Sequence, residues 1–505
     1  MVMVSTNVEV VCRETIKPLR PTPNHLRNYI LSSIDQNAPP IYIPVLLFYL
    51  TSTTNIITRD QKLCMLKKSL AECLSEYYPL AGTFRDDYSV VECSDEGAEF
   101  IEAIVNCNIS QIIGTSNVKL LNQLLPFEPT GNWGKQLKQK GDEREVLVAA
   151  QANLFSYGQS TCFLNIFCFL YPLFRCGGFA IGVCVSHKIA DGTSVVAFLN
   201  SWASKSLNTN SENTNTVPPP IFDSAKNFPP REIPRYSHDT GITNKTIVTK
   251  RFIFDSSSIL ALKNKASKGI IGSLDENFKF PTRVEAVSAL IWRRVLALYR
   301  SKPKAAKICV AVHAVNVRQR MEPPVPNHTF GNYWTVAIAP ALLQTEQNAG
   351  DDSNINMTIL VEKLNKSIRD INADYVDNVI KGRKNMNVLR GPSKNANALD
   401  SNFEESEQQK SRLDGDSVET TVRDFLKGDL EVCNFTSWCR FPVYEVDFGW
   451  GKPEWVCSPI RSFKNLVILM GTKDGDGMEA SVNLLEEDML LFENDPEILS
   501  FAYCP

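Results

Sequence analysis

The sequence Phe-Pro-Val-Tyr-Glu-Val-Asp-Phe-Gly-Trp-Gly-Lys-Pro occupies residues 441–453, and its centre, Asp-Phe-Gly-Trp-Gly at 447–451, is too specific to arise by chance. Gly449 permits a tight backbone path, because glycine has no side chain that would clash in unusual backbone conformations. Asp447 can accept hydrogen bonds from backbone or arginine donors, and Trp450 offers a large surface for packing. The motif carries little chemistry of its own, so we expect the reactive groups elsewhere in the chain.

A second motif, His-x-x-x-Asp, extends from His187 to Asp191 and follows an apolar run at residues 179–186. The run has the length and composition of a buried strand, and apolar residues recur at helical spacing after Gly192. We therefore predict a strand, a turn and a helix, with His187 at the end of the strand. On its own, this motif is a weak signal in a chain that contains five histidines.

In this order and at this separation, the two motifs resemble the plant BAHD acyltransferases, which use acyl-coenzyme A to esterify alcohols or acylate amines. The resemblance covers nearly the whole chain and includes Leu-Ser-Ser-Ile-Asp-Gln at 31–36, which is similar to the family's opening strand. Further matching segments lie at 77–82, 281–285, 316–318, 330–332 and 434–440. These segments agree best with the branch of the family that acetylates alkaloids and other specialised-metabolite alcohols.

The resemblance implies an α/β fold with two pseudosymmetric domains, similar to chloramphenicol acetyltransferase, and a tunnel between them. The alternation of strand-like and helical patterns agrees with the α/β class. Residues 62–77 are predicted as a helix and residues 145–152 as a strand, and Thr282 with Glu285 forms a capping box ahead of a buried helix. The expected parts are an N-terminal acyltransferase domain with HxxxD at 1–204, a crossover linker at 205–235 and a C-terminal acyltransferase domain with DFGWG at 236–505.

Composition limits the classes of partner. The chain has 505 residues and a net charge of -3, so it offers no basic field for nucleic acid or for an anionic membrane. Its fourteen cysteines form no CxxC pair, which argues against zinc, and we expect no metal. Residues 1–17 contain no uninterrupted apolar core of a secretory signal, so we expect a cytosolic protein with reduced thiols, and a monomer.

His187 is the residue that we expect to activate the acceptor. A hydroxyl is a poor nucleophile at neutral pH, and a neutral imidazole, whose ordinary pKa is about 6.5, can take its proton during attack on the thioester. On an extended strand His187 shares a face with Val183 and Val185, whereas Cys184 and Ser186 point to the other face. A covalent intermediate on Cys184 or Ser186 is therefore disfavoured, and direct transfer in a ternary complex is the expected route.

The resemblance also assigns structural roles. Asp191 is expected to turn away from the site and to pair with Arg318; the alternative is that Asp191 orients the imidazole directly. Asp447, Gly449 and Trp450 are expected to be structural and to lie near the coenzyme A channel.

The tetrahedral intermediate needs a hydrogen-bond donor for its oxyanion. We expect this donor in the segment around Thr436 and Trp438, either as the Thr436 hydroxyl or as the indole N–H of Trp438. The alternative for Trp438 is that it is only a core aromatic residue.

One segment departs from the family pattern. Similar proteins pass almost directly from the strand at residues 146–155 to an equivalent of Cys-Gly-Gly at 176–178, whereas here residues 156–174 intervene. This insert is strongly aromatic, but its apolar run of about fourteen residues is shorter than the ~20 that a membrane helix needs. Two interpretations stay open: an unspliced or mispredicted segment, since U-rich RNA would encode such a composition, or a real loop. The polar stretch at 393–415 is expected to be a surface loop.

The predicted function is the transfer of a short acyl group, with acetyl-CoA as the expected donor, to a hydroxyl of a plant alkaloid or related metabolite. His187 is the expected general base. The resemblance makes acyl-CoA a co-substrate, with no permanently bound cofactor, and a small hydrophobic alcohol or amine the acceptor. The alternatives are an N-acyltransferase, an acyltransferase for phenolic or terpenoid alcohols, or a catalytically silent paralogue that binds ligands.

Overall fold

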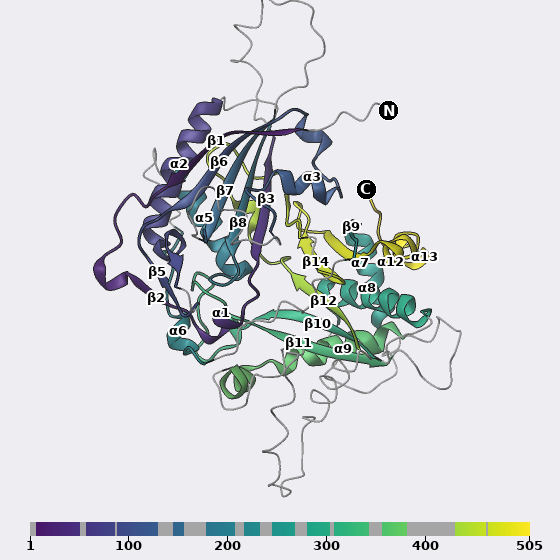
Figure 1. Ribbon diagram of the computed structural model, residues 1–505. Helices are drawn as coiled ribbons and strands as arrows, with labels where there is room; N and C mark the ends of the chain where they lie inside the picture. Colours follow the sequence, from purple (N-terminus) through teal and green to yellow (C-terminus); the bar gives the residue numbers. More distant parts are fainter. Residues whose placement is uncertain are drawn as a thin grey trace, which may run out of the picture.

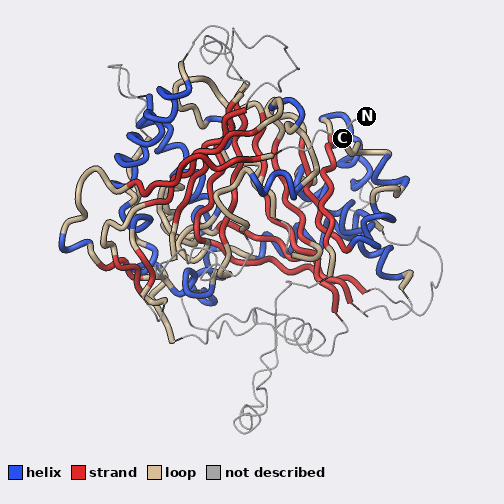
Figure 2. Tube along the Cα trace, turned by 45° about the horizontal axis from the view of Figure 1, so that its top comes forward, coloured by secondary structure: helices blue, strands red, loops and turns tan. Residues whose placement is uncertain are grey.

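The computed structural model of the chain describes residues 7–50, 57–85, 88–129, 145–155, 178–207, 217–232, 245–267, 280–302, 308–342, 356–380, 430–460 and 463–505. Within these residues, two six-stranded sheets form the centre of the molecule and helices flank them on both sides (Figure 1, Figure 2). A smaller sheet contains three strands, β2 (Asn28–Ile30), β5 (Val90–Glu92) and β4 (Thr83–Phe84). The expected α/β class is therefore confirmed.

The first sheet has the strand order β1-β6-β7-β8-β3-β13, in which β6 and β7 run parallel and the other neighbours antiparallel. Its strands are β1 (Val8–Ile16), β6 (Ala98–Val105), β7 (Val148–Phe155), β8 (Phe179–Ser186), β3 (Tyr42–Tyr49) and β13 (Trp455–Cys457). Every residue of β7, β8 and β3 is buried, because α2 (Arg59–Glu76) and α5 (Gly192–Leu207) cover one face and α3 (Val118–Gln123) packs on the other. This double coverage explains why these strands read as continuous apolar runs.

The second sheet has the order β11-β10-β12-β14-β15-β9 and is also mixed. Its strands are β11 (Trp334–Leu342), β10 (Ile308–Asn316), β12 (Leu430–Ser437), β14 (Leu466–Gly471), β15 (Met478–Leu485) and β9 (Ile247–Phe254). Helices α8 (Arg283–Arg300) and α9 (Met357–Asp370) cover one face. The other face is turned toward the first half of the molecule, since Ile468 and Met470 of β14 belong to the same apolar cluster as residues of β8 and α5.

The segment between β12 and β14 crosses from the second sheet to the first (Figure 1). Within it, β13 forms hydrogen bonds with the edge of β3, with Val456 paired to Leu47. Phe448 and Trp450 are buried in the apolar cluster of the first half. The C-terminal half of the chain therefore supplies both an edge strand and core side chains to the first sheet.

The remaining helices are short or lie at the periphery. They are α1 (Ser33–Asn37), α6 (Ser224–Asn227), α7 (Ser256–Ser267), α10 (Ala373–Tyr375), α12 (Glu486–Phe492) and α13 (Pro496–Leu499), with single turns η1 (Asn24–Leu26), η2 (Tyr78–Ala81), η3 (Ile109–Gln111), η5 (Arg318–Arg320), η7 (Val376–Ile380) and η10 (Val443–Glu445). In the part of the chain that the structure describes, no helix combines the length and the apolar character that a membrane span requires.

Most of the predicted local elements are present. The helix predicted at 62–77 corresponds to α2, the strand at 145–152 to β7, and the strand at 179–186 to β8. The capping box of Thr282 and Glu285 begins α8.

The opening strand expected at residues 31–36 is wrong. Ser32 and Asp35 form a reciprocal capping box that starts α1 at this point, so the backbone turns into a helix. Residues 156–174 and 393–415 lie outside the described residues. Phe155 and Gly178 are the described residues that flank residues 156–177, and the N–H of Phe155 donates to the carbonyl of Gly178 at 3.2 Å. The strands β7 and β8 are therefore paired up to Phe155 and Gly178.

Candidate active site

His187 lies immediately after β8, and the predicted strand, turn and helix surround it. β8 ends at Ser186 and α5 begins at Gly192. The backbone N–H of His187 donates to the carbonyl of Ile41 at 2.8 Å, and its carbonyl accepts from Nδ2 of Asn332 at 2.8 Å. Because both main-chain polar groups are bonded, the position from which the imidazole extends is fixed.

The side chain of His187 is half-buried, with its Nδ1 on the enclosed side. Its Nδ1 is buried and has no hydrogen-bond partner among the described residues. The indole of Trp334 lies beside it, with the ring centroids 5.9 Å apart. Burial lowers the pKa of His187 below its ordinary 6.5, although the charge of Asp191 acts in the opposite direction. The imidazole is therefore neutral at neutral pH and can accept a proton.

Asp191 forms an ion pair with Arg318, which is contributed by the second half of the chain. Nη1 of Arg318 lies 2.7 Å from Oδ2 of Asp191 and Nη2 lies 3.0 Å from Oδ1. The same carboxylate accepts from the backbone N–H groups of Ser194, at 2.9 Å, and Tyr333, at 3.0 Å. These four bonds engage both oxygens, so the carboxylate is held by Arg318 and by backbone rather than by the imidazole.

The Arg318 guanidinium is fully buried, and the Asp191 side chain is 8% exposed. Burial alone would raise the pKa of Asp191, but the charge and hydrogen bonds of Arg318 lower it below the ordinary 3.8. The pair is therefore fully ionised at neutral pH. It joins the turn that follows His187 to η5 of the second half.

A buried polar cluster that the sequence did not reveal surrounds the main chain of His187. Asp35, at the start of α1, accepts from both the backbone N–H and Nδ2 of Asn332 at 2.8 Å each. Asn332 in turn donates to the His187 carbonyl and accepts from the indole N–H of Trp334 at 3.0 Å. The only sequence signal was the Ser-x-x-Asp spacing of a capping box at Ser32 and Asp35, which predicts a helix start and not a contact with a distant loop.

The face of the second sheet that is turned toward His187 is partly open. Trp334, which contacts His187, is paired with Asn316 across β11 and β10, and directly paired residues of antiparallel strands point to the same face. Among the alternate residues of both strands that share this face, four aliphatic ones are half-buried or exposed. They are Val312, Ala314, Val336 and Ile338. An apolar wall thus stands beside the imidazole.

The two expected oxyanion donors lie on and directly after β12, the strand next to β10. Val312 is paired in parallel with Asn434, which places Thr436, two residues further along β12, on the same face. Trp438 is buried. Its indole lies so close to Gly192 that a β-carbon at that position would be only 3.5 Å from the ring. Trp438 therefore packs against the turn that follows His187, within the core of the first half.

The DFGWG motif lies at the opposite end of β8. Oδ1 of Asp447 accepts from the N–H groups of both glycines of the motif, at 2.8 and 3.0 Å, and Gly449 has φ +110°, a conformation that favours glycine. Trp450 packs edge-on against Phe179, with ring centroids 5.7 Å apart. Phe179 begins β8 and His187 follows its end, so about 26 Å of extended strand separates the two. The motif shapes a loop and the core, remote from the imidazole.

The disfavoured nucleophile Cys184 and a second histidine, the buried His313, are in surroundings unsuited to catalysis. Cys184 points away from the cluster that contains Val183 and Val185, and burial raises the pKa of its thiol. A thiol that stays protonated is a poor nucleophile. His313 is buried and stacked on Phe435 at 4.6 Å, on the face of the second sheet that the helices cover.

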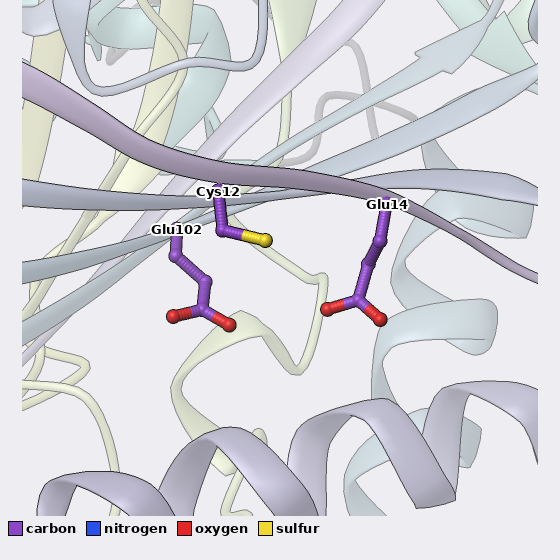
Figure 3. Close-up of side chains that lie close together, drawn as sticks. All are labelled: Cys12, Glu14 and Glu102. Carbon is purple, nitrogen blue, oxygen red and sulfur yellow. The ribbon is translucent and has the colours of Figure 1, made fainter.

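A group of potential metal ligands lies far from this site, on the outer strands of the first sheet (Figure 3). Cys12 and Glu14 of β1 and Glu102 of β6 project to the same side. The ammonium group of Lys67 in α2 lies 2.5 Å from a carboxylate oxygen of each glutamate. A cation is thus already present between the two carboxylates, and the group is satisfied as an ion-pair network.

Comparisons with known proteins agree with this arrangement. The model of the Transferase family matches residues 6–499. Stemmadenine O-acetyltransferase of Catharanthus roseus is 32% identical over 489 residues, covering 97% of this chain and 96% of that protein. The limonoid 1-O-acetyltransferase of Citrus sinensis is 34% identical over 504 residues and salutaridinol 7-O-acetyltransferase of Papaver somniferum 32% over 527 residues, each covering 97% of both chains.

Two solved structures share the fold. The crystal structure of vinorine synthase is 30% identical, covers 98% of this chain and 99% of its own, and superposes with a TM-score of 0.70. The structure of TRI101 from F. graminearum complexed with coenzyme A and T-2 mycotoxin is 16% identical and covers 94% of this chain and 99% of its own, with a TM-score of 0.64. The two-domain architecture expected for the chain is therefore confirmed at the level of the fold.

Proposed function

The chain belongs to the Transferase family, the BAHD acyltransferases of plants, and from this premise we propose that it acetylates a hydroxyl group of a specialised metabolite with acetyl-CoA. The similar proteins whose names state a reaction are O-acetyltransferases that act on stemmadenine, on limonoids and on salutaridinol. These acceptors favour oxygen over nitrogen as the attacking atom. Among them we favour an alkaloid alcohol or a similarly rigid, apolar alcohol.

The observation that carries the proposal is the half-buried, neutral imidazole of His187 beside an apolar wall. Its pKa is lowered by burial, so the ring is in the basic form over the whole neutral range. The half-exposed aliphatic residues of β10 and β11 suit an acceptor with a hydrocarbon skeleton, because such a surface gains free energy when an apolar group covers it. Together they supply a base and an apolar contact for an alcohol.

The proposed reaction is direct transfer. The imidazole of His187 takes the hydroxyl proton while the oxygen attacks the thioester carbonyl and forms a tetrahedral oxyanion. The oxyanion collapses, the carbon–sulfur bond breaks, and the thiolate of coenzyme A leaves and takes the proton from the imidazolium. The Thr436 hydroxyl or the Trp438 indole N–H is proposed to stabilise the oxyanion. Asp191, through Arg318, is proposed to keep the turn that carries His187 in place.

The proposal is tested by measuring release of coenzyme A. Purified protein is incubated with acetyl-CoA and a panel of alkaloid, limonoid and amine acceptors, and the free thiol and acetylated products are measured. We expect thiol release that depends on an alcohol acceptor and that is lost in His187→Ala. Release with amines alone would assign N-acylation instead, and no acceptor-dependent release from any acceptor would contradict an active transferase.

A further inference from the structure

The side-chain amide of Asn332 joins three groups beside the imidazole. Nδ2 donates to Oδ1 of Asp35 and to the carbonyl of His187, both at 2.8 Å, and Oδ1 accepts from Nε1 of Trp334 at 3.0 Å. Both N–H donors of the amide are thus used. Asn332 is 0% exposed, so water does not compete for these bonds. The amide has one orientation in which all three bonds are made.

Asn332 acts on His187 by two routes. Its bond to the His187 carbonyl fixes the main chain, and its bond to Trp334 holds an indole whose ring centroid is 5.9 Å from the imidazole centroid. Nδ1 of His187 has no hydrogen-bond partner among the described residues, so the packing contact with Trp334 contributes to the orientation of the ring. We propose that Asn332 is a positioning residue that holds the imidazole ready for proton transfer, with Asp35 as its anchor and Trp334 as its contact with the ring. This inference rests on the proposed function.

Asp35 is suited to anchor the amide because it is fully buried and ionisable. It accepts from N and Oγ of Ser32 at 2.9 and 2.6 Å and from N and Nδ2 of Asn332 at 2.8 Å each. Hydrogen bonds to a charged carboxylate are roughly twice as strong as those to a neutral acceptor. Burial raises the pKa of Asp35 to about 6, so mild acid weakens the hold on Asn332. Three further titratable groups face Asp35, each with a pKa above this value: Tyr29, Lys188 and Tyr333.

Trp334→Phe is the gentlest test, because it keeps an aromatic ring beside the imidazole and removes the part of the indole that carries the N–H donated to Asn332. We expect kcat to fall about 10-fold with the KM for acetyl-CoA unchanged, since a misplaced base affects the transition state and not substrate binding. Trp202→Phe is the matched control. Trp202 is also buried and donates through Nε1, to the carbonyl of Leu66 at 3.1 Å, but it lies in the core between α2 and α5. The kcat of the Trp202→Phe variant is expected to stay within twofold of the kcat of the parent protein.

Asp35→Asn preserves the size of the anchor and removes its charge. We expect a larger fall in kcat than in Trp334→Phe. We also expect an acid limb of the pH profile that follows His187 alone, because the group with a pKa of about 6 is gone. An acid limb that keeps the parent's shape in Asp35→Asn would contradict the role of the carboxylate.

A readout that does not depend on turnover separates this inference from the proposed function. The chain has five histidines, so the His187 imidazole can be followed by NMR with labelled histidine and assigned with His187→Asn. We expect its pKa to rise toward 6.5 in Trp334→Phe, as water reaches the ring, and to stay unchanged in Trp202→Phe. An unchanged His187 pKa together with an unchanged kcat in Trp334→Phe overturns the inference. Failure of the proposed function appears separately, as absence of coenzyme A release by the parent.

Discussion

Replacing Asp191 by asparagine removes one charge from an ion pair that water does not reach. The Arg318 guanidinium is 0% exposed and keeps neutral partners in the variant, namely the carbonyls of Thr329 and Gly331, each at 3.0 Å from Nη2, and the hydroxyl of Ser194. Removing one partner of a buried pair costs about 3 to 5 kcal/mol, because the other charge stays buried without compensation. We expect about 3 kcal/mol, the lower end of this range, since those neutral acceptors remain.

The loss is measured by urea unfolding at pH 7, followed by circular dichroism. The pKa of Asp191 is lowered in the folded state, so its contribution to stability is complete above the ordinary value of 3.8 and is lost only as the pH falls through the folded pKa. Asp370→Asn is the matched control, because Asp370 pairs with Lys366 at 3.5 Å on the surface of α9. That exposed pair should contribute under about 0.5 kcal/mol.

A double-mutant cycle tests the pairing itself. Arg318→Met should destabilise the protein as Asp191→Asn does, and the combined variant should lose far less than the sum of the two. Coupling below about 0.5 kcal/mol, or equal losses in Asp191→Asn and Asp370→Asn, would refute the reasoning.

Four further predictions follow from the described geometry. His187→Ala should lower kcat by at least ~100-fold, measured as coenzyme A release, while calorimetry shows acetyl-CoA binding within twofold of the parent; near-parental activity would remove His187 from the mechanism. The kcat/KM of the parent should stay level as the pH falls from 8 toward about 6.5 and should decline only below pH 6.5, because the lowered pKa of His187 keeps the imidazole neutral. A decline in kcat/KM that begins above pH 7 would contradict this assignment of the base. Gly449→Ala should lower the free energy of unfolding by more than ~1 kcal/mol. The loss should be smaller in Gly475→Ala, because Gly475 also has a positive φ but a β-carbon there would face open space. Equal losses in the two variants would mean that only backbone strain matters. Deleting residues 156–174 should raise soluble yield and preserve turnover, since the flanking strands are already bonded at that point; loss of acceptor turnover would identify a functional loop.

The sequence predicted best what depends on near neighbours. The position of His187 at the end of a strand followed from the apolar run of β8, and the start of α8 followed from the Thr282 and Glu285 spacing. Both are local patterns, in which residues a few positions apart determine backbone conformation. The contact of Asp191 with Arg318 was reached only through the family resemblance, because no spacing connects the two.

The polar cluster beside the imidazole lay beyond local reasoning. Asp35 and Asn332 are 297 residues apart, and neither residue type signals a partner at that distance. The capping role of Asp35 is readable from Ser32, but the two bonds to Asn332 exist only after both halves of the chain have come together. The roles proposed for Thr436 and Trp438 depend on a bound substrate and stay predictions.

The pairing of β13 with β3 has a consequence for how this protein is made. The hydroxyl of Tyr49 in β3 donates to the carbonyl of Val446, which is synthesised 397 residues later. At about 5–20 residues per second, a ribosome needs roughly 20 to 80 seconds to produce the segment that completes the first sheet. During that interval the edge of β3 is unpaired, and the core lacks the rings of Phe448 and Trp450. The nascent chain therefore exposes the edge of β3 until nearly the last tenth of the chain emerges, and a fragment that ends before residue 455 retains that exposed edge permanently.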